Sequence, residues 1–359
     1  MEQRIRFLGI DLGSQNLKLV CHLDTSPRHP GIFVTKDGPA PGSLVELGGE
    51  PQTLGNALAG LRVQAGLGLK RAPAAVSMPT GAMVVKAVHL PPLSNRERQA
   101  AFQLEVERCV PPGEGEVVGD YMPLAPEVDS GGGRNEGYLL LVSSQQLVDA
   151  LRTALSTARI QPEAVEPEPV TLFRLLMMMV PPGDTGAHVL VDLGASGTRV
   201  LVVKDGQLML FRDLTLGGKH LTAALAQSLG IEQHEAEVLK CSRYQAAESI
   251  PELAGAAERL EKEIERSLRY VERTQKIEGY SSLHLVGGGA SWPFLRGLVE
   301  RAVGREAKES VVVSGGQVEP IMAQAAALAL YQYEPPKPQP VRRPAVTQFR
   351  RAAQGGIEQ

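Results

Sequence analysis

Two stretches of this chain repeat each other closely: LGIDLGSQNLKLV, residues 8–20, and VLVDLGASGTRVL, residues 189–201. In both, an apolar run ends in Asp-Leu-Gly, and a basic residue follows the aspartate by seven positions. The two aspartates, Asp11 and Asp192, are 181 residues apart (192 − 11). An apolar run, a glycine-containing turn and a second apolar run are the pattern of a β-hairpin. The repeat therefore predicts two related halves, each beginning with a hairpin.

The turns of these hairpins have the composition of phosphate-binding loops. Glycine and small polar residues let backbone N–H groups approach phosphate oxygens closely. In the first turn, Ser14 and Asn16 are candidate phosphate donors, and Lys18 is a candidate counter-charge. Lys18 would fit a strand position facing solvent almost as well. Two such turns facing each other across a cleft would hold a triphosphate from both sides.

An aspartate directly before each turn suits a magnesium site. Phosphate would repel a carboxylate in direct contact, whereas Mg²⁺ keeps several waters and takes only one or two carboxylates. Asp11 and Asp192 are therefore candidate Mg²⁺ ligands through water. The alternative for each is an Asx hydrogen bond that stabilises the turn.

A third glycine site consists of Gly287, Gly288 and Gly289. It follows a short apolar strand pattern, residues 283–286, and precedes a helical pattern over residues 294–303. Without side chains, this segment would give a flat floor for an adenosine. A triple glycine alone is typical of a flexible turn, and it is the order of all three sites that favours nucleotide binding.

Composition excludes several other classes of function. Lys and Arg number 37 against 40 Asp and Glu, and aromatic residues make up 4%, so neither a polyanion surface nor base-stacking platforms for nucleic acid are expected. The three cysteines form no CxxC pair, which argues against a disulfide framework or structural zinc. No apolar run reaches the roughly 20 residues of a spanning helix. We expect a cytoplasmic protein without a signal peptide.

With these motifs in this order, the chain resembles the actin-like ATPase superfamily. The hairpins are similar to its two phosphate motifs, with Thr198 at the usual hydroxyl position, and residues 287–289 are similar to its adenosine motif. The resemblance implies an α/β fold of the actin-like, ribonuclease H-like kind: two related domains around a cleft, plus an inserted small subdomain. It implies ATP and Mg²⁺ as cofactors. The residues implied in cofactor binding are Asp11, Gly13, Ser14, Asn16, Lys18, Asp192, Gly194, Ala195, Ser196, Thr198, Gly217, Gly218, Gly287, Gly288 and Gly289.

The same resemblance suggests a catalytic residue and a nucleoside-binding helix face. Glu168 matches an acid-proline pair that faces the γ-phosphate in relatives, where it would align the attacking water. An ordinary acidic residue at a helix start explains Glu168 equally well. Glu263, Arg266 and Ser267 share one helix face, which chaperone-type relatives use around adenine and ribose. A solvated helix with intrahelical ion pairs is at least as good an interpretation.

Within the superfamily, the chain resembles the PilM family of type IV pilus assembly proteins over roughly residues 5–332. The segments that carry this resemblance are FQLEVERCVP at 102–111, Asp120-Tyr121, AVEPEP at 164–169 and GGKHLT at 217–222. The resemblance implies an ATP-binding scaffold whose weak ATPase activity is uncertain. Its implied partner is the N-terminal cytoplasmic peptide of the inner-membrane protein PilN. It also implies a homo-oligomeric ring with other pilus components at the membrane's cytoplasmic face, and no nucleic acid.

Two other functions share the fold and stay open as alternatives. A small-molecule kinase would need an aspartate base in a substrate pocket, and no second acidic site stands out after Asp11 and Glu168. An FtsA-like filament former would need a C-terminal amphipathic helix, which the proline-rich segment 335–359 does not favour.

Composition and turn signals divide the chain into five segments. We expect a first actin-like domain (1–90), an inserted small α/β subdomain (91–165), a connecting helix segment (166–184), a second actin-like domain (185–333) and a disordered Pro/Arg-rich tail (334–359). Within the first domain, residues 74–78 and 83–88 read as a pair of strands around Pro79-Thr80-Gly81.

Overall fold

The computed structural model describes most of the chain. The described residues are 5–23, 33–46, 50–67, 73–109, 115–128, 132–242, 251–309, 311–313, 316–331 and 349–350. The predicted disordered tail, 334–359, therefore lies outside the described residues except for a two-residue strand, β15 (Phe349–Arg350), which pairs with Val118 and Gly119. Among the described residues, no helix is both long and apolar enough to cross a bilayer.

The first hairpin belongs to a five-stranded sheet of order β3-β2-β1-β4-β8. Its strands are β1 (Ile5–Leu12), β2 (Asn16–Leu23), β3 (Phe33–Pro39), β4 (Pro73–Met78) and β8 (Gln161–Pro167). Side chains alternate across a strand, so Leu8, Ile10 and Leu12 of β1 pack on one face against helices α1 (Pro51–Gln64) and α3 (Gln145–Thr157). Gly9 points to the opposite face, where helix α9 (Ala323–Ala329) packs directly on the strand.

The second hairpin belongs to a four-stranded sheet with the matching order β11-β10-β9-β12. Its strands are β9 (Ala187–Leu193), β10 (Thr198–Lys204), β11 (Gln207–Leu214) and β12 (Ser282–Val286). Helices cover its outer face: α5 (Gly218–Leu229), α6 (Gln233–Cys241), α7 (Pro251–Gln275) and α8 (Pro293–Val303). Both repeated stretches are antiparallel hairpins, with Asp11 opposite Lys18 and Asp192 opposite Arg199. The predicted repeat is confirmed.

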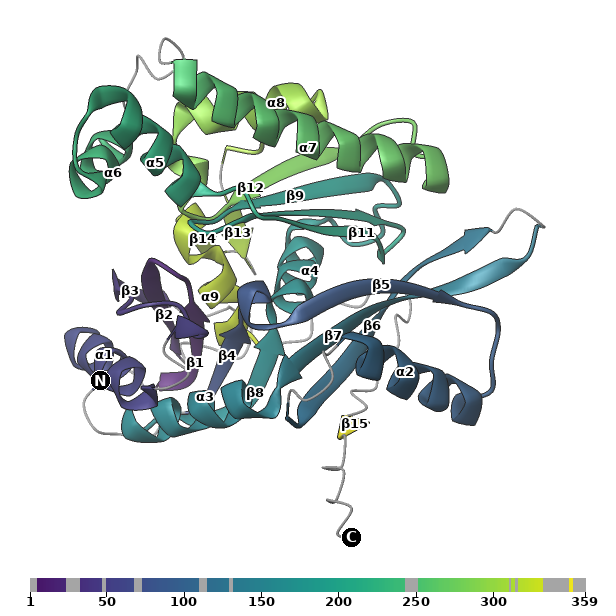
Figure 1. The fold of residues 1–359 in the computed structure, drawn as a ribbon, viewed down its shortest axis with the longest axis horizontal. Coiled ribbons are helices and arrows are strands. Elements are labelled where there is room, and N and C mark those ends of the chain that lie inside the picture. Colours follow the sequence, from purple (N-terminus) through teal and green to yellow (C-terminus); the bar gives the residue numbers. More distant parts are fainter. Residues whose placement is uncertain are drawn as a thin grey trace, which may run out of the picture.

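One buried core lies between the two sheets. Helix α4 (Glu168–Met179) and α9 pack there, and their side chains meet residues of both sheets, including Val20 of β2, Leu190 of β9 and Leu201 of β10. Figure 1 shows the resulting layers, with α1 and α3 on one outside, α7 and α8 on the other, and α4 and α9 between the sheets. The remaining short elements near this core are β13 (Val311–Val313), β14 (Gly316–Val318), η4 (Gly288–Ser291) and η5 (Pro320–Met322).

A third sheet forms a small unit beside the first, on the right of Figure 1. Its strands are β5 (Val84–Leu90), β6 (Val117–Val128) and β7 (Arg134–Ser144), with β15 at one edge, and α2 (Asn95–Cys109) packs on it. Phe102 of α2 stacks on Tyr121 of β6, with ring centroids 4.2 Å apart, and meets Tyr138 of β7 edge-on.

The predicted pairing of residues 74–78 with 83–88 is wrong. The segments are β4 and β5, but β4 pairs with β1 and β8, whereas β5 pairs with β7 in the small sheet. The short helix η2 (Thr80–Ala82) separates them and redirects the chain. The predicted domain boundaries stay a proposal. The strands of the small sheet, β5 to β7, span residues 84–144, whereas the inserted subdomain expected from the sequence spans 91–165.

Candidate functional site

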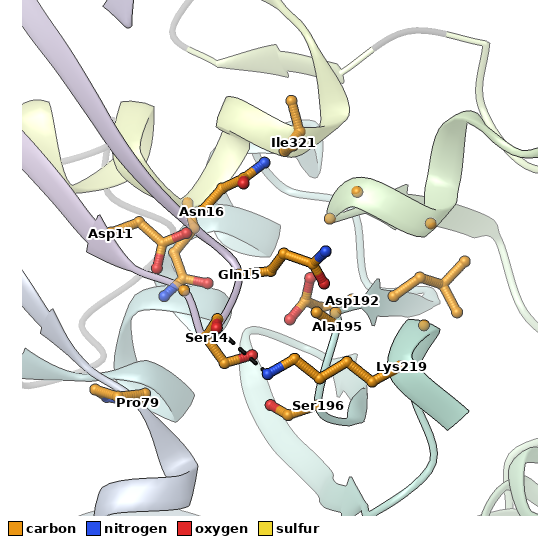
Figure 2. Close-up of a pocket in the computed structure, with 18 of the residues that line it drawn as sticks. Asp11, Ser14, Gln15, Asn16, Pro79, Asp192, Ala195, Ser196, Lys219 and Ile321 are labelled. Atoms are coloured by element: carbon orange, nitrogen blue, oxygen red, sulfur yellow. Dashed lines mark hydrogen bonds between the residues drawn. The ribbon is translucent and has the colours of Figure 1, made fainter. Parts of the chain in front are cut away.

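A cavity of about 730 Å³ lies between the two hairpins, and both Asp11 and Asp192 line it. Its volume is within the ~300–1,000 Å³ usual for small-molecule and cofactor sites. Figure 2 shows the two turns approaching from opposite sides, Ser14 to Asn16 from the first and Ala195 with Ser196 from the second. Residues 181 positions apart in the chain therefore share one crevice.

Most of the residues predicted from the sequence line this cavity. Those that do are Asp11, Gly13, Ser14, Asn16, Lys18, Glu168, Asp192, Gly194, Ala195, Ser196, Gly218, Gly287, Gly288 and Gly289. The predicted residues that are not part of the lining are Thr198, Gly217, Glu263, Arg266 and Ser267.

The first hairpin holds its aspartate in a network of short contacts. Lys18 Nζ lies 2.7 Å from Asp11 Oδ2, and Ser77 Oγ donates to Asp11 Oδ1 at 3.2 Å. Burial alone would lower the pKa of Lys18, but the charge and hydrogen bond of Asp11, together with the charges of Asp192 and Glu168, outweigh burial and raise that pKa. Gly13 is required here because a Cβ would lie 2.6 Å from the Asn16 carbonyl oxygen, a backbone atom. Lys18 therefore faces the cavity as a fixed cation.

The second hairpin repeats this design with an arginine. Arg199 Nη1 lies 3.6 Å from Asp192 Oδ2, and a Cβ at Gly194 would lie 2.7 Å from the same Nη1. In both hairpins, then, the end of the cross-strand cation lies close to where a Cβ would stand on the glycine two residues after the aspartate. Arg199 also reaches the first half, donating from Nη2 to Thr80 Oγ1 at 2.8 Å.

Arg199 compensates three neighbouring carboxylates, of which Asp192 and Glu168 are buried. Its guanidinium lies 3.3 Å from Glu168 Oε2 and 3.2 Å from Asp213 Oδ1, in addition to its contact with Asp192. Burial raises the pKa of Asp192 to about 7, with Arg199 opposing that rise and the nearby Glu168 adding to it. The site therefore carries a carboxylate whose ionised form needs further positive charge, as a divalent cation would provide.

Glu168 is the first residue of α4 and is nearly fully buried. Its Oε2 accepts the backbone N–H of Thr80 at 2.8 Å and faces Arg199. The side chain thus lines the cavity, as the resemblance implies, but its oxygen already has two partners. Its role in aligning water stays a prediction.

The two predicted residues next to the second turn support it from behind. Thr198 is fully buried and donates its hydroxyl to the Leu216 carbonyl at 2.7 Å. Gly217 packs so closely that a Cβ would lie 2.5 Å from Gly197 N. This contact lets the first turn of α5 dock on the hairpin, where Gly218 N donates to Gly194 O at 2.9 Å.

The glycine segment 287–289 closes another side of the cavity. Gly287 has a φ of +82°, and a Cβ there would lie 2.4 Å from Asp192 Oδ1. Both observations require glycine at this position. At Gly288 the nearest neighbour of a Cβ would be the end of the Ile321 side chain, at 3.7 Å, so the segment presents bare backbone to the cavity.

The helix face predicted to contact adenine and ribose lies on α7, outside the cavity lining. Arg266 is 79% exposed and forms an ion pair with Glu263 at 3.8 Å, while Ser267 Oγ donates to the Glu263 carbonyl. These contacts match the alternative interpretation of intrahelical pairs on a helix surface. A nucleoside role for this face stays a prediction.

Several lining residues were missed by reasoning from sequence. They are Ser43, Glu46, Arg199, Lys219, Glu237, Lys240, Cys241, Trp292 and Gln324. For Arg199 the signal was available, because it occupies the position of Lys18 in the repeat. Lys219 directly follows two predicted glycines. Residues of α6, such as Glu237 and Lys240, reach the cavity only through tertiary packing, so no local pattern marks them.

The arrangement fits a magnesium nucleotide. Among the described residues, no three His, Cys, Asp or Glu side chains are grouped to hold a metal directly. Mg²⁺ does not need such a group, because one or two carboxylates with phosphate oxygens and waters complete its shell. Asp11 and Asp192, on opposite turns, place two carboxylates at this cavity.

Comparisons with known proteins agree with this geometry. The family described as "Type IV pilus assembly protein PilM" matches residues 9–315. A solved chain of the "PilM-PilN type IV pilus biogenesis complex" is 25% identical, with 92% of this chain and 100% of that chain covered and a TM-score of 0.72. The ethanolamine utilization protein EutJ from Carboxydothermus hydrogenoformans is 17% identical, with 92% and 91% covered and a TM-score of 0.56, a likeness of fold alone. Both have the actin-like ATPase fold, so the predicted fold class is confirmed.

Proposed function

Because this chain belongs to the PilM family of type IV pilus assembly proteins, we propose that it is an ATP-binding scaffold of the pilus assembly machine. Its partner in this proposal is the N-terminal cytoplasmic segment of PilN, in keeping with the PilM–PilN complex to which the chain is similar. The scaffold sits at the cytoplasmic face of the inner membrane as a homo-oligomeric ring with other pilus components.

The observation that carries nucleotide binding is the pair of hairpins facing each other across one cavity. A hairpin that served only to turn the chain would have no need of a matching partner 181 residues away. Each of these two hairpins places an aspartate, a glycine and a cross-strand cation in the lining of the same cavity. A ligand with several negative charges in a row fits between them.

In this proposal each group has a physical task. Backbone N–H groups of the two turns bind phosphate oxygens, and the segment 287–289 supports the nucleoside. Asp11 and Asp192 orient the waters of a Mg²⁺ ion, and Lys18 neutralises phosphate charge at close range. Mg²⁺, when bound with the nucleotide, screens the phosphates from these carboxylates.

We place hydrolysis at a low rate or at none. A carboxylate that aligns an attacking water must have a free lone pair and appreciable basicity. Glu168 Oε2 instead accepts an N–H from Thr80 and faces the Arg199 guanidinium, so the lone pairs of that oxygen are already engaged. ATP then acts mainly as a ligand whose presence changes the protein, not as a fuel.

Titration of the protein with Mg·ATP tests this proposal. We expect binding at one site in the wild type and an affinity about tenfold to hundredfold lower in Asp11→Ala, since a charged contact of 1.4–2.8 kcal/mol is lost. Asp11→Asn, which keeps the shape of the side chain, guards against misfolding as the cause. Asp149→Ala, at a half-exposed position on α3, is the control that should bind as the wild type does. Equal affinities of the wild type and both Asp11 variants would show that the first hairpin is not the phosphate clamp.

A second titration, with a synthetic peptide of the PilN N-terminal segment, separates the scaffold from a small-molecule kinase. A scaffold should bind the peptide, with an affinity that differs between the apo and the ATP-bound protein. Absence of peptide binding in both states would contradict the assignment of PilN as the partner.

A further inference from the structure

We infer that Lys219 is the phosphate-binding cation of the second half, reaching across the cavity to the place where the phosphate chain passes between the two turns. This inference rests on the proposed binding of ATP and deepens it. Lys219 is the second residue of α5 and directly follows the glycines 217 and 218. Its backbone is fixed on the second hairpin, because Lys219 N donates to Ala195 O at 2.8 Å.

The side chain of Lys219 spans the cavity from one half to the other. Its Nζ donates to the Ser14 carbonyl of the first turn at 3.4 Å, a contact between residues 205 positions apart. Figure 2 shows this amine between Ser14 on the first turn and Ser196 on the second. Any ligand held by both turns must therefore pass next to it.

Lys219 differs from the other cations that line the cavity in its pairing. Lys18 lies 2.7 Å from Asp11, Lys240 lies 2.6 Å from Glu237, and Arg199 faces three carboxylates. Within the part of the chain that the structure describes, no carboxylate lies within 4 Å of Lys219 Nζ. An ammonium whose closest acceptor is a carbonyl at 3.4 Å has charge available for an incoming anion.

One acidic group that interacts electrostatically with Lys219 has a different partner. Glu46 also lines the cavity, and its carboxylate accepts the backbone N–H of Ser43 at 2.6 Å. That hydrogen bond is the main reason why the pKa of Glu46 is lowered, with Lys219 adding a smaller effect. Lys219 and Glu46 therefore interact electrostatically without forming an ion pair. Removing the charge of Glu46 should not abolish the function of Lys219.

A series of ligands with increasing phosphate number tests this inference. We expect Lys219→Ala to weaken Mg·ATP binding about tenfold to hundredfold and ADP binding by a smaller factor, and to leave adenosine binding unchanged. Lys219→Arg should recover part of the loss, and Lys219→Glu should deepen it. The control is Lys262→Ala on α7, where the side chain is 68% exposed and is not part of the cavity lining.

Each outcome decides between the inference and its competitors. Equal loss for ATP and adenosine would mean a structural role for Lys219 and would overturn the inference, as would unchanged ATP binding in Lys219→Ala. Glu46→Gln should leave ATP affinity unchanged or raise it; if it weakens ATP binding as much as Lys219→Ala, Lys219 acts through Glu46 and the inference fails. Failure of the wild type to bind ATP at all would overturn the proposed function itself. That result differs from failure of the inference, in which the wild type binds ATP and the Lys219 variants bind it equally well.

Discussion

At the scale of single residues, Arg199 connects the two halves of the molecule. It comes from the second hairpin but contacts Thr80 and Glu168, which belong to the other side of the cavity. Because it is buried beside three carboxylates, its charge is balanced only in this arrangement. Arg199 thus links the second hairpin to Thr80 and Glu168 by direct contacts.

Replacing Arg199 by methionine should destabilise the protein by about 3–5 kcal/mol, the usual cost of breaking a buried ion pair on one side. The reason is that Glu168 and Asp192 remain buried without their cation. The free energy of unfolding, measured with urea, checks this. Arg266→Met, on the exposed face of α7, should change it by no more than about 0.5 kcal/mol.

A second variant distinguishes charge balance from loss of packing. Adding Glu168→Gln to Arg199→Met removes one of the uncompensated charges, so the double variant should be more stable than the single one. If Arg199→Met unfolds at the same urea concentration as the wild type, Arg199 does not stabilise the protein by balancing the charges of Glu168 and Asp192.

At the scale of elements, the close packing of α9 on β1 decides how the core between the sheets is built. A Cβ at Gly9 would lie 1.9 Å from the Ala325 carbonyl oxygen and 2.3 Å from Ala329 N. Both are backbone atoms of α9, so the whole helix would have to move to make room for a side chain. The alternation of Leu8, Gly9 and Ile10 therefore has packing reasons on both faces of the strand.

Gly9→Ala should cost about 3 kcal/mol or more in free energy of unfolding, at the upper end for overpacking a core. The matched control is Gly60→Ala in α1, where a Cβ meets nothing within 4 Å. There the same change should stabilise the protein by about 0.5–1 kcal/mol, because alanine has the higher helix propensity. Thermal or urea unfolding of both variants measures the contrast; similar stabilities of the two would contradict the close contact of α9 with β1.

Elements with a local signal could be predicted from the sequence, and elements set by distant pairing could not. The hairpins at Asp11 and Asp192 were predictable because turn and strands are contiguous and occur twice. The start of α2 was marked by Ser94, whose hydroxyl accepts from Glu97 N while Glu97 accepts from Ser94 N. The pairing of β4 with β5 was a wrong prediction because β5 pairs instead with β7, across α2 and β6.

The candidate site divides along the same line. Residues on the two turns and the glycine segment were found because the repeat and the glycines mark them. Lys240 and Glu237 were not, because only the packing of α5 on α6 and the docking of α5 on the hairpin bring them to the cavity. The spacing of residues along the sequence does not predict such a contact.

At the scale of the whole molecule, the two halves share more than the cavity. The core around α4 and α9 takes side chains from both sheets. The small sheet also touches the second half, where Gln275 of α7 donates to the Pro126 carbonyl of β6 at 3.2 Å. The inserted unit is therefore in direct contact with the second half.

The central claim is that one nucleotide is held by both hairpins at once, and hydrogen exchange of the backbone amides tests it most directly. Mass spectrometry of the protein with and without Mg·ATP should show slower exchange in both turns, residues 12–16 and 193–198, at the same ligand concentration. The exposed helix α2 serves as an internal reference that should not change. Protection of only one of the two turns by saturating Mg·ATP, or of neither, would contradict the claim.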